Sequence, residues 1–423
     1  MVTDPGVRRQ QLSSRSLLPL YLAHSFSHIL LGIFPAVLYL LKEQSGASYA
    51  LLGAVFTAAT LLYGLGAFPT GFLLNRTRPL VVVRVCLAVA AVATALIAAA
   101  PSAGFMAAGL LLLGLALSPY HTAANTTLSR ASGNDARLTA HHGMFGSIGL
   151  AVAPAFGTVL AYAGGWRLPF AVGAVLTGVV LAFTLALPPL ANPRDARGDP
   201  GHSLGLTHVR ALGLVFAITI CLGFIFRGFE TYLPSLLMQH ADVFAGSRLV
   251  QAGLLASLVY LIGFFGQWWA SRLGHHRHVE RVYTALLAGQ TVFLVAVFAA
   301  TQWSLILVLL LFSFVHFTTQ PIDNVLTGKY TSLSRRGVGY GLSFGLSFAV
   351  GSLAAVAGGA VADAAGGQLQ WVYLMLAVAG VVAAGCGLAL TRVARRVEAV
   401  VPAAGEPGAF PVADGPFDRD LPG

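Results

Sequence analysis

Two histidines, His24 and His28, lie four residues apart in the apolar segment AHSFSHILLGIFPAVLYLL, residues 23–41. Residues with this spacing share one face of a helix, so both imidazole rings can face the same surroundings. Imidazole changes its charge near neutral pH, so the pair could carry a proton or, when protonated, bind an anionic group. The alternative is structural: one ring donates a hydrogen bond to a backbone carbonyl and tightens helix packing.

Five further ionisable residues lie inside long apolar segments: His121, Arg227, Glu230, His316 and Asp323. Arg227 and Glu230, three apart, can face the same side of a helix. They could clamp a substrate or form an outer gate in which Glu230 takes up a proton, or they could only neutralise each other.

Asp323 follows His316 by seven residues, which is two helical turns, so the two side chains share a face. Because burial disfavours the charged form of a carboxylate, Asp323 could accept and release a proton. The alternative is a brace with Arg335 or Arg336. His142 begins another apolar segment, and there a packing role is favoured.

The histidines and Asp323 could also handle a transition metal or a metal chelate, since imidazole suits Zn, Cu, Fe and Ni. No ligand spacing predicts a resident metal, and the run HHRH (275–278) reads as a solvated charge cluster in a basic loop. No Walker-type phosphate-binding loop is present, which excludes ATP as the energy source. No nucleophile, base and acid form a recognisable set, so we predict neither an enzyme nor a cofactor.

The composition indicates a membrane protein. Of 423 residues, 57% are hydrophobic and 9% are charged, whereas soluble domains carry about 25% charged residues. The net charge of +10 comes from residues in short connections, so it does not indicate a nucleic-acid partner. About 20 apolar residues span a bilayer as a helix, and twelve segments reach that length: roughly 17–41, 48–74, 79–100, 103–128, 138–163, 167–190, 210–239, 247–271, 280–301, 303–328, 337–362 and 370–392.

Lysine and arginine predict the orientation of these spans. With both termini in the cytoplasm, 21 of the 25 basic residues fall in cytoplasmic segments, as the positive-inside rule requires. The cytoplasmic linker 191–208 then separates an N-terminal six-helix bundle at 1–190 from a C-terminal six-helix bundle at 209–392. A disordered cytoplasmic tail is predicted for 393–423, where Pro, Gly and acidic residues are frequent.

The two halves contain similar motifs at nearly constant spacing. FPTGFLLNR (68–76) is echoed by FFGQWWASR (264–272), and AGGWRLPF (163–170) by AGGQLQWVY (365–373). Parallel halves of six spans are typical of transporters that bind their substrate between the halves, near the middle of the membrane.

The stretch GFLLNRTRP, 71–79, resembles the loop G-x-x-x-D-R-x-G-R of the major facilitator superfamily. Gly71 and Arg76 match that loop, Asn75 replaces its acid, and Arg272 stands at the matching place in the second half. The resemblance implies that Gly71, Arg76 and Arg272 contribute to a cytoplasmic gate, with control by charge pairing weakened in the first half by the loss of the acid.

Two narrower likenesses point to exporters of that superfamily. GSIGLAVAPAFG (146–157) resembles the fifth-helix motif G-x-x-x-G-P-x-x-G-G of its antiporters, and an ordinary Gly- and Pro-kinked helix is the alternative. His24, Pro35 and His121 resemble motifs of the fosmidomycin-resistance branch of drug exporters, in which His28 replaces an acid.

The resemblance implies an all-α integral membrane protein with twelve transmembrane helices in two pseudo-symmetric six-helix bundles, placed in the cell (inner) membrane. It implies a secondary active transporter, a proton antiporter that exports a small organic molecule or drug by alternating access. Import, or transport of a transition metal or metal chelate, is the alternative. We expect a monomer whose partners are the substrate, protons and the lipid bilayer. Glu230, Asp323, His24 and His28 are the expected proton-coupling residues, and the expected substrate-binding residues are His24, His28, His121, Arg227, Glu230, His316 and Asp323.

Overall fold

The structure is a computed structural model that describes residues 16–74, 76–132, 136–187, 206–274, 276–331 and 336–400. Within these ranges every regular element is a helix, and twelve stretches are long and apolar enough to cross a membrane. The predicted all-α fold with twelve membrane helices is therefore confirmed. Asn75, Arg335, most of the predicted linker and the predicted tail beyond Val400 lie outside the described residues.

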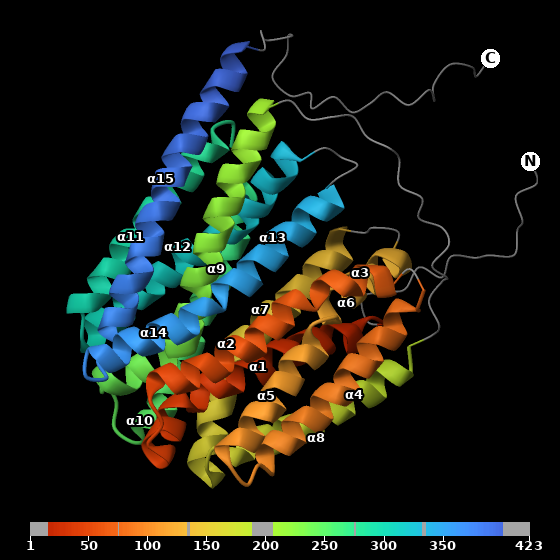
Figure 1. The fold of residues 1–423 in the computed structure, drawn as a ribbon, viewed down its shortest axis with the longest axis vertical. Helices are drawn as coiled ribbons and strands as arrows, with labels where there is room; N and C mark the ends of the chain where they lie inside the picture. The colour runs from red at the N-terminus through yellow and green to blue at the C-terminus, as the bar shows by residue number, and fades with distance from the viewer. Residues whose placement is uncertain are drawn as a thin grey trace, which may run out of the picture.

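The first six spans form the N-terminal bundle and the last six form the C-terminal bundle (Figure 1). The helices of the N-terminal bundle are α1 (Leu18–Ser45), α2 (Tyr49–Leu65), α3 (Ala67–Leu73), α4 (Pro79–Ala98), α5 (Ala103–Leu117), α6 (Tyr120–Ser132), α7 (Ala136–Gly164) and α8 (Arg167–Leu185). Those of the C-terminal bundle are α9 (Leu206–His240), α10 (Arg248–Leu273), α11 (Val279–Ala299), α12 (Gln302–Tyr330), α13 (Arg336–Gly351), α14 (Leu353–Ala364) and α15 (Gln370–Val400).

Three spans that the sequence predicts as single helices are each divided into two. The breaks fall at Gly66 between α2 and α3, at Ser118 and Pro119 between α5 and α6, and at Ser352 between α13 and α14. Proline lacks the N–H that a helix interior requires, and Gly–Ser pairs are common sites of kinks.

The last helix is longer than the apolar pattern predicts. The last span was expected to end near 392, with a disordered tail after it, whereas α15 continues to Val400. The segment TRVARRVEAV (391–400) is rich in residues that favour a helix, so the helix persists after the apolar stretch ends.

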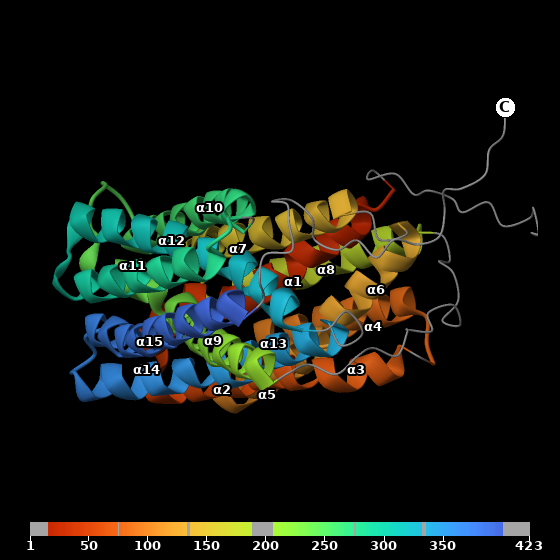
Figure 2. The same cartoon turned by 90° about the horizontal axis from the view of Figure 1, so that it is seen from above.

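An even number of spans returns the chain to the side on which it began. The start of α1 and the end of α15 therefore lie on one side of the molecule, which we call the terminal face, and the other side is the far face. The bundles contact each other through α2 against α13 and α14, α7 against α10, and α1 against α9. Figure 2 shows α7 beside α10 and α2 beside α14 along the seam.

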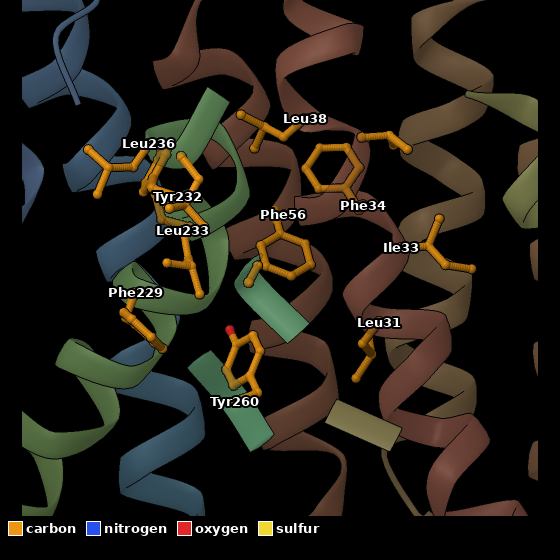
Figure 3. Close-up of a cluster of buried hydrophobic side chains, with 14 of the residues drawn as sticks. Leu31, Ile33, Phe34, Leu38, Phe56, Phe229, Tyr232, Leu233, Leu236 and Tyr260 are labelled. Atoms are coloured by element: carbon orange, nitrogen blue, oxygen red, sulfur yellow. The ribbon is translucent and has the colours of Figure 1, made fainter. Parts of the chain in front are cut away.

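The hydrophobic core is continuous between the bundles only in the half nearer the far face. This shared core takes residues from both bundles, including Phe34, Phe56, Phe229 and Tyr260 (Figure 3). Nearer the terminal face the core is split: one cluster, from Leu17 to Val180, belongs to the N-terminal bundle, and another, from Ala211 to Leu390, to the C-terminal bundle. We call these the N-terminal core and the C-terminal core.

Small residues allow the bundles to approach closely along the seam. A Cβ atom on Gly53 of α2 would collide with the backbone of Ala355 on α14, and one on Gly359 of α14 would collide with the backbone of Tyr49 on α2. Thr57 also donates a hydrogen bond of 2.8 Å to the carbonyl of Ser352. Helices in lipid associate through such backbone approaches and interhelical hydrogen bonds, because apolar burial cannot drive them together.

Candidate functional site

Three imidazole rings meet where the shared core gives way to the two separate cores. His24 and His28 come from α1 and His121 from the first turn of α6. The ring centroid of His24 lies 5.1 Å from that of His28 and 5.0 Å from that of His121, and His28 and His121 are 5.5 Å apart. His24 is buried, whereas His28 and His121 are half-buried. We call these three residues the histidine triad.

A fourth histidine, His142 on α7, contacts His24 of the triad. The Nδ1 atom of His24 lies 2.6 Å from the backbone carbonyl of His142, and the two rings stack with centroids 4.1 Å apart. A carbonyl can only accept, so Nδ1 of His24 carries the hydrogen. The packing role expected for His142 fits this contact. Its partner could not be read from the sequence, because the two residues are 118 positions apart.

Close packing of α7 on α1 places these rings. A Cβ on Gly146 would lie 2.5 Å from Cε1 of His24, and one on Gly149 would collide with the backbone of Ser25. Gly157 approaches Ala36 in the same way. The glycines of the antiporter-like motif thus allow α7 to pack closely against α1.

An aromatic wall leads from the triad to the other bundle. The ring of Tyr63 on α2 lies 5.9 Å from that of His121 and 5.4 Å from that of Phe348 on α13. Phe344, one turn earlier on α13, lies 5.5 Å from His121 and 4.3 Å from Phe348. These three aromatic residues form the aromatic wall, which contains side chains of both bundles.

An ion pair lies at the other end of the aromatic wall. Arg227 and Glu230 on α9 are hydrogen-bonded to each other through Nη1 and Oε2. The residues are only 2% and 5% exposed, so the pair is buried. The Arg227 guanidinium lies 5.7 Å from the ring of Phe348 and 5.5 Å from that of Phe56, within the range of cation–π attraction.

His316 lies apart from the triad, inside the C-terminal bundle. It is fully buried, with its ring 5.3 Å from that of Phe312 and 6.3 Å from that of Phe226. Its Nδ1 atom lies 3.0 Å from Oε1 of Gln290 on α11. The ring of Phe226 also lies 5.9 Å from the guanidinium of Arg227.

Asp323 is also enclosed by its own bundle. Tyr283 of α11 donates a hydrogen bond of 2.6 Å to one carboxylate oxygen, and Thr219 of α9 donates one of 2.8 Å to the other. The suggested brace with Arg335 or Arg336 stays a prediction, because Arg335 and the side chain of Arg336 lie outside what the structure describes. The structure therefore brings together His24, His28, His121, Arg227 and Glu230, and it leaves His316 and Asp323 outside this group.

Among the described residues, Arg76 and Arg272 of the expected gate have no acidic partners. Within the described ranges the ion pairs are Lys42–Glu43, Arg227–Glu230, Arg248–Asp242 and Lys329–Glu280, so neither Arg76 nor Arg272 takes part in one. Arg272 instead stacks on Trp268, with its guanidinium 4.2 Å from the ring. A Cβ on Gly71 would meet nothing within 4 Å.

Comparison with known proteins identifies the fold. The family described as Major Facilitator Superfamily matches residues 20–355. A crystal structure of a mutant nucleoside transporter NupG has a TM-score of 0.73 at 17% sequence identity, and the match covers 89% of this chain and 99% of that chain. A bacterial homolog of the human lysosomal transporter Spinster, in an inward-facing and occupied conformation, has a TM-score of 0.74 at 15% identity, covering 90% of this chain and 97% of that chain. At these identities the likeness to the solved structures shows the fold alone. No curated protein sequence matches the chain.

Proposed function

The chain belongs to the major facilitator superfamily, and on that basis we propose that it is a proton-coupled secondary transporter that exports a small organic molecule. One observation carries this proposal. The histidine triad of one bundle and the Arg227–Glu230 pair of the other lie at the two ends of a single aromatic wall. Ionisable groups inside the membrane commonly mark proton relays, and transporters of this kind bind at the interface between their halves.

The chemistry of these groups supports antiport. Neutral imidazole and ionised carboxylate accept hydrogen bonds. Protonation removes the acceptor nitrogen of imidazole and turns one carboxylate oxygen into a donor. A substrate that donates hydrogen bonds to Glu230 or to the half-buried rings of His28 and His121 would therefore compete with protons for the same atoms. Protons arriving from the more acidic side would displace the substrate there.

The aromatic wall supports an organic substrate with an apolar or aromatic part. Tyr63, Phe344 and Phe348 present ring faces and edges between the two polar ends of the site. Aromatic rings bind such groups by stacking, and Arg227 offers a charge for any anionic group that replaces Glu230. In this proposal Asp323 is a second proton site within the C-terminal bundle, and His316 packs against Phe226 in the same bundle. The branch of drug exporters is the nearest functional analogy.

The split core supports loading from the terminal face. Among the described residues the bundles share no hydrophobic cluster on that side, whereas one cluster joins them on the far side. The positive-inside pattern assigns the terminal face to the cytoplasm. If the bundles are joined on the outer side of the cell membrane and separated on the cytoplasmic side, the transporter is in the state that accepts substrate from the cytoplasm.

Reconstituted vesicles test the proposal. We expect an imposed pH gradient, with the compartment facing the far face more acidic, to drive accumulation of substrate on that acidic side. A protonophore should abolish this accumulation. Substrates can be found by a susceptibility and uptake screen of cells with and without the gene at two external pH values. Accumulation on the alkaline side would support import, and flux that ignores the gradient would remove proton coupling from the proposal.

A second candidate cargo is a transition metal or metal chelate. It is favoured by one observation: a nitrogen of each triad histidine lies within 4.8 Å of the other two.

A further inference from the structure

The histidine triad has the chemistry and the spacing of a metal-binding site. Each ring offers one nitrogen, and the three nitrogens lie within 4.8 Å of one another. His24 and His28 are separated by one helical turn, the spacing with which two histidines on one helix face bind zinc. His121 completes the set from another helix. Imidazole nitrogen is a preferred ligand of Zn²⁺, Ni²⁺, Co²⁺ and Cu²⁺.

His24 is oriented as a metal-bound histidine would be. Its Nδ1–H donates to the carbonyl of His142, so the lone pair is on Nε2, the other nitrogen of the ring. Histidines that bind metals typically donate their second nitrogen to a carbonyl or carboxylate in this way, which fixes both the tautomer and the ring. Gly146 leaves the space that this ring position requires.

His121 carries an unsatisfied polar atom at the same place. Its Nε2 is buried and has no hydrogen-bond partner among the described residues. The hydroxyl of neighbouring Tyr63 is also buried and has no partner among them. Buried nitrogen and oxygen atoms nearly always find a partner in a folded protein or its ligand. A metal ion bound to Nε2 would give this nitrogen a partner.

Metal binding requires the three nitrogens to come closer together than they are in this structure. Zinc binds imidazole nitrogen at about 2.0–2.1 Å, which places tetrahedral ligand atoms about 3.4 Å apart. His24 is held by α7, whereas His28 and His121 are only half-buried. Their movement toward His24 would bring the nitrogens to that separation.

We propose that His24, His28 and His121 form a site for a divalent transition-metal ion of the zinc type, with a coordination position left for water or for a donor atom of the cargo. Three histidine ligands and an open position are the pattern of zinc sites that exchange ligands. Because the triad is part of the proposed transport site, the role of the ion rests on the proposed function. Binding of the ion does not.

The test is a titration of the purified full-length chain, with any affinity tag removed, using Co²⁺ as a spectroscopic substitute for Zn²⁺. We expect about one Co²⁺ per chain, with the visible absorption of an imidazole-bound ion. His28→Ala and His121→Ala should each weaken binding at least about 100-fold. The control His276→Ala removes an exposed histidine of the loop before α11 and should bind as the unmodified chain does.

A second pair of variants tests the positioning of His24 without removing a ligand. Gly146→Ala would push the His24 ring and should weaken Co²⁺ binding about 10- to 100-fold. Gly143→Ala, on the same helix with nothing within 4 Å of the added Cβ, should leave binding unchanged. Absent binding in the unmodified chain, or equal binding in His28→Ala and His121→Ala, would overturn the inference.

Failure of the metal site and failure of the proposed transport can be distinguished by experiment. Proton-driven flux measured in vesicles washed with a chelator and assayed without metal would uphold the proposed organic transport even if Co²⁺ does not bind. Co²⁺ binding by the triad in a chain that shows no proton-driven flux would uphold the metal site and overturn the proposed coupling.

Discussion

The carboxylate of Asp363 on α14 accepts a hydrogen bond of 2.8 Å from the backbone N–H of Ala50, in the first turn of α2 in the opposite bundle. Its other oxygen accepts one of 3.0 Å from the N–H of Tyr49. The first N–H groups of a helix have no partner within the helix, and the N-terminus favours a negative charge. A residue of the C-terminal bundle thus caps the N-terminus of a helix of the N-terminal bundle at the far face.

This contact predicts that Asp363 helps to hold the far face closed. Loss of a helix-capping side chain costs about 1 kcal/mol, which corresponds to about a five-fold change in the ratio of closed to open molecules. Asp363→Ala should therefore increase exposure of the far side of the seam about five-fold. The measurement is the labelling rate of a cysteine placed at the buried position Leu52, in a chain from which Cys86, Cys221 and Cys386 have been removed.

The matched control for Asp363 is Asp242→Ala. Asp242 is an exposed residue on the same face, in a loose ion pair of 3.7 Å with Arg248, and such surface pairs contribute little. Its removal should leave the labelling rate unchanged. Equal rates for the Asp363 variant and the unmodified chain would show that the cap does not contribute to closure.

A second prediction concerns the closest approach of the bundles. A Cβ on Gly53 would lie 2.8 Å from the carbonyl carbon of Ala355 and 2.9 Å from the Tyr232 hydroxyl, so Gly53→Ala must move backbone. Such overpacking costs about 1–3 kcal/mol. We expect a lower melting temperature in detergent and faster labelling at the far face. Gly178→Ala on α8, whose added Cβ meets nothing within 4 Å, should keep the melting temperature and the flux. Equal melting temperatures for Gly53→Ala and Gly178→Ala would contradict the prediction.

The number of spans could be predicted because apolar length and basic residues are local properties. Each span had to be about as long as the bilayer is thick, whatever it packs against. The breaks inside three spans had weaker signals, since Pro119 and the glycines before Ala67 and Ser352 also occur where helices continue, as Pro154 does within α7.

The site was predictable only where its contacts are local. The spacing of His24 with His28, and of Arg227 with Glu230, shows that each pair shares a helix face. The same reasoning placed His316 and Asp323 on one face, and both do contact α11, through Gln290 and Tyr283. No pattern within one helix says which neighbour that face meets. The packing of the whole bundle rotates α12 so that this face is directed away from the seam.

A third prediction concerns the enclosed carboxylate of Asp323. Because it accepts two hydrogen bonds from buried hydroxyls, removing either donor leaves a buried acceptor short of a partner. Tyr283→Phe should lower the free energy of unfolding by about 1–3 kcal/mol, measured as a drop in melting temperature or in denaturant midpoint. Tyr162→Phe removes a hydroxyl from a residue that is 67% exposed and should have no effect. Unchanged stability in Tyr283→Phe would show that water or another group replaces the donor.

The last prediction separates coupling from transport at Glu230. Glu230→Gln keeps the size of the side chain and a hydrogen-bond acceptor for Arg227 but cannot take up or release a proton. In vesicles we expect it to abolish accumulation driven by a pH gradient, while exchange of labelled for unlabelled substrate at equal pH continues, because exchange needs binding and bundle movement but no net proton transfer. Glu43→Gln, at an exposed ion pair of 3.8 Å with Lys42, is the control and should respond to the gradient as the unmodified chain does. If gradient-driven accumulation persists in Glu230→Gln, the coupling proton must be carried by the histidine triad or by Asp323. If both accumulation and exchange are lost, Glu230 is required for substrate binding or for folding.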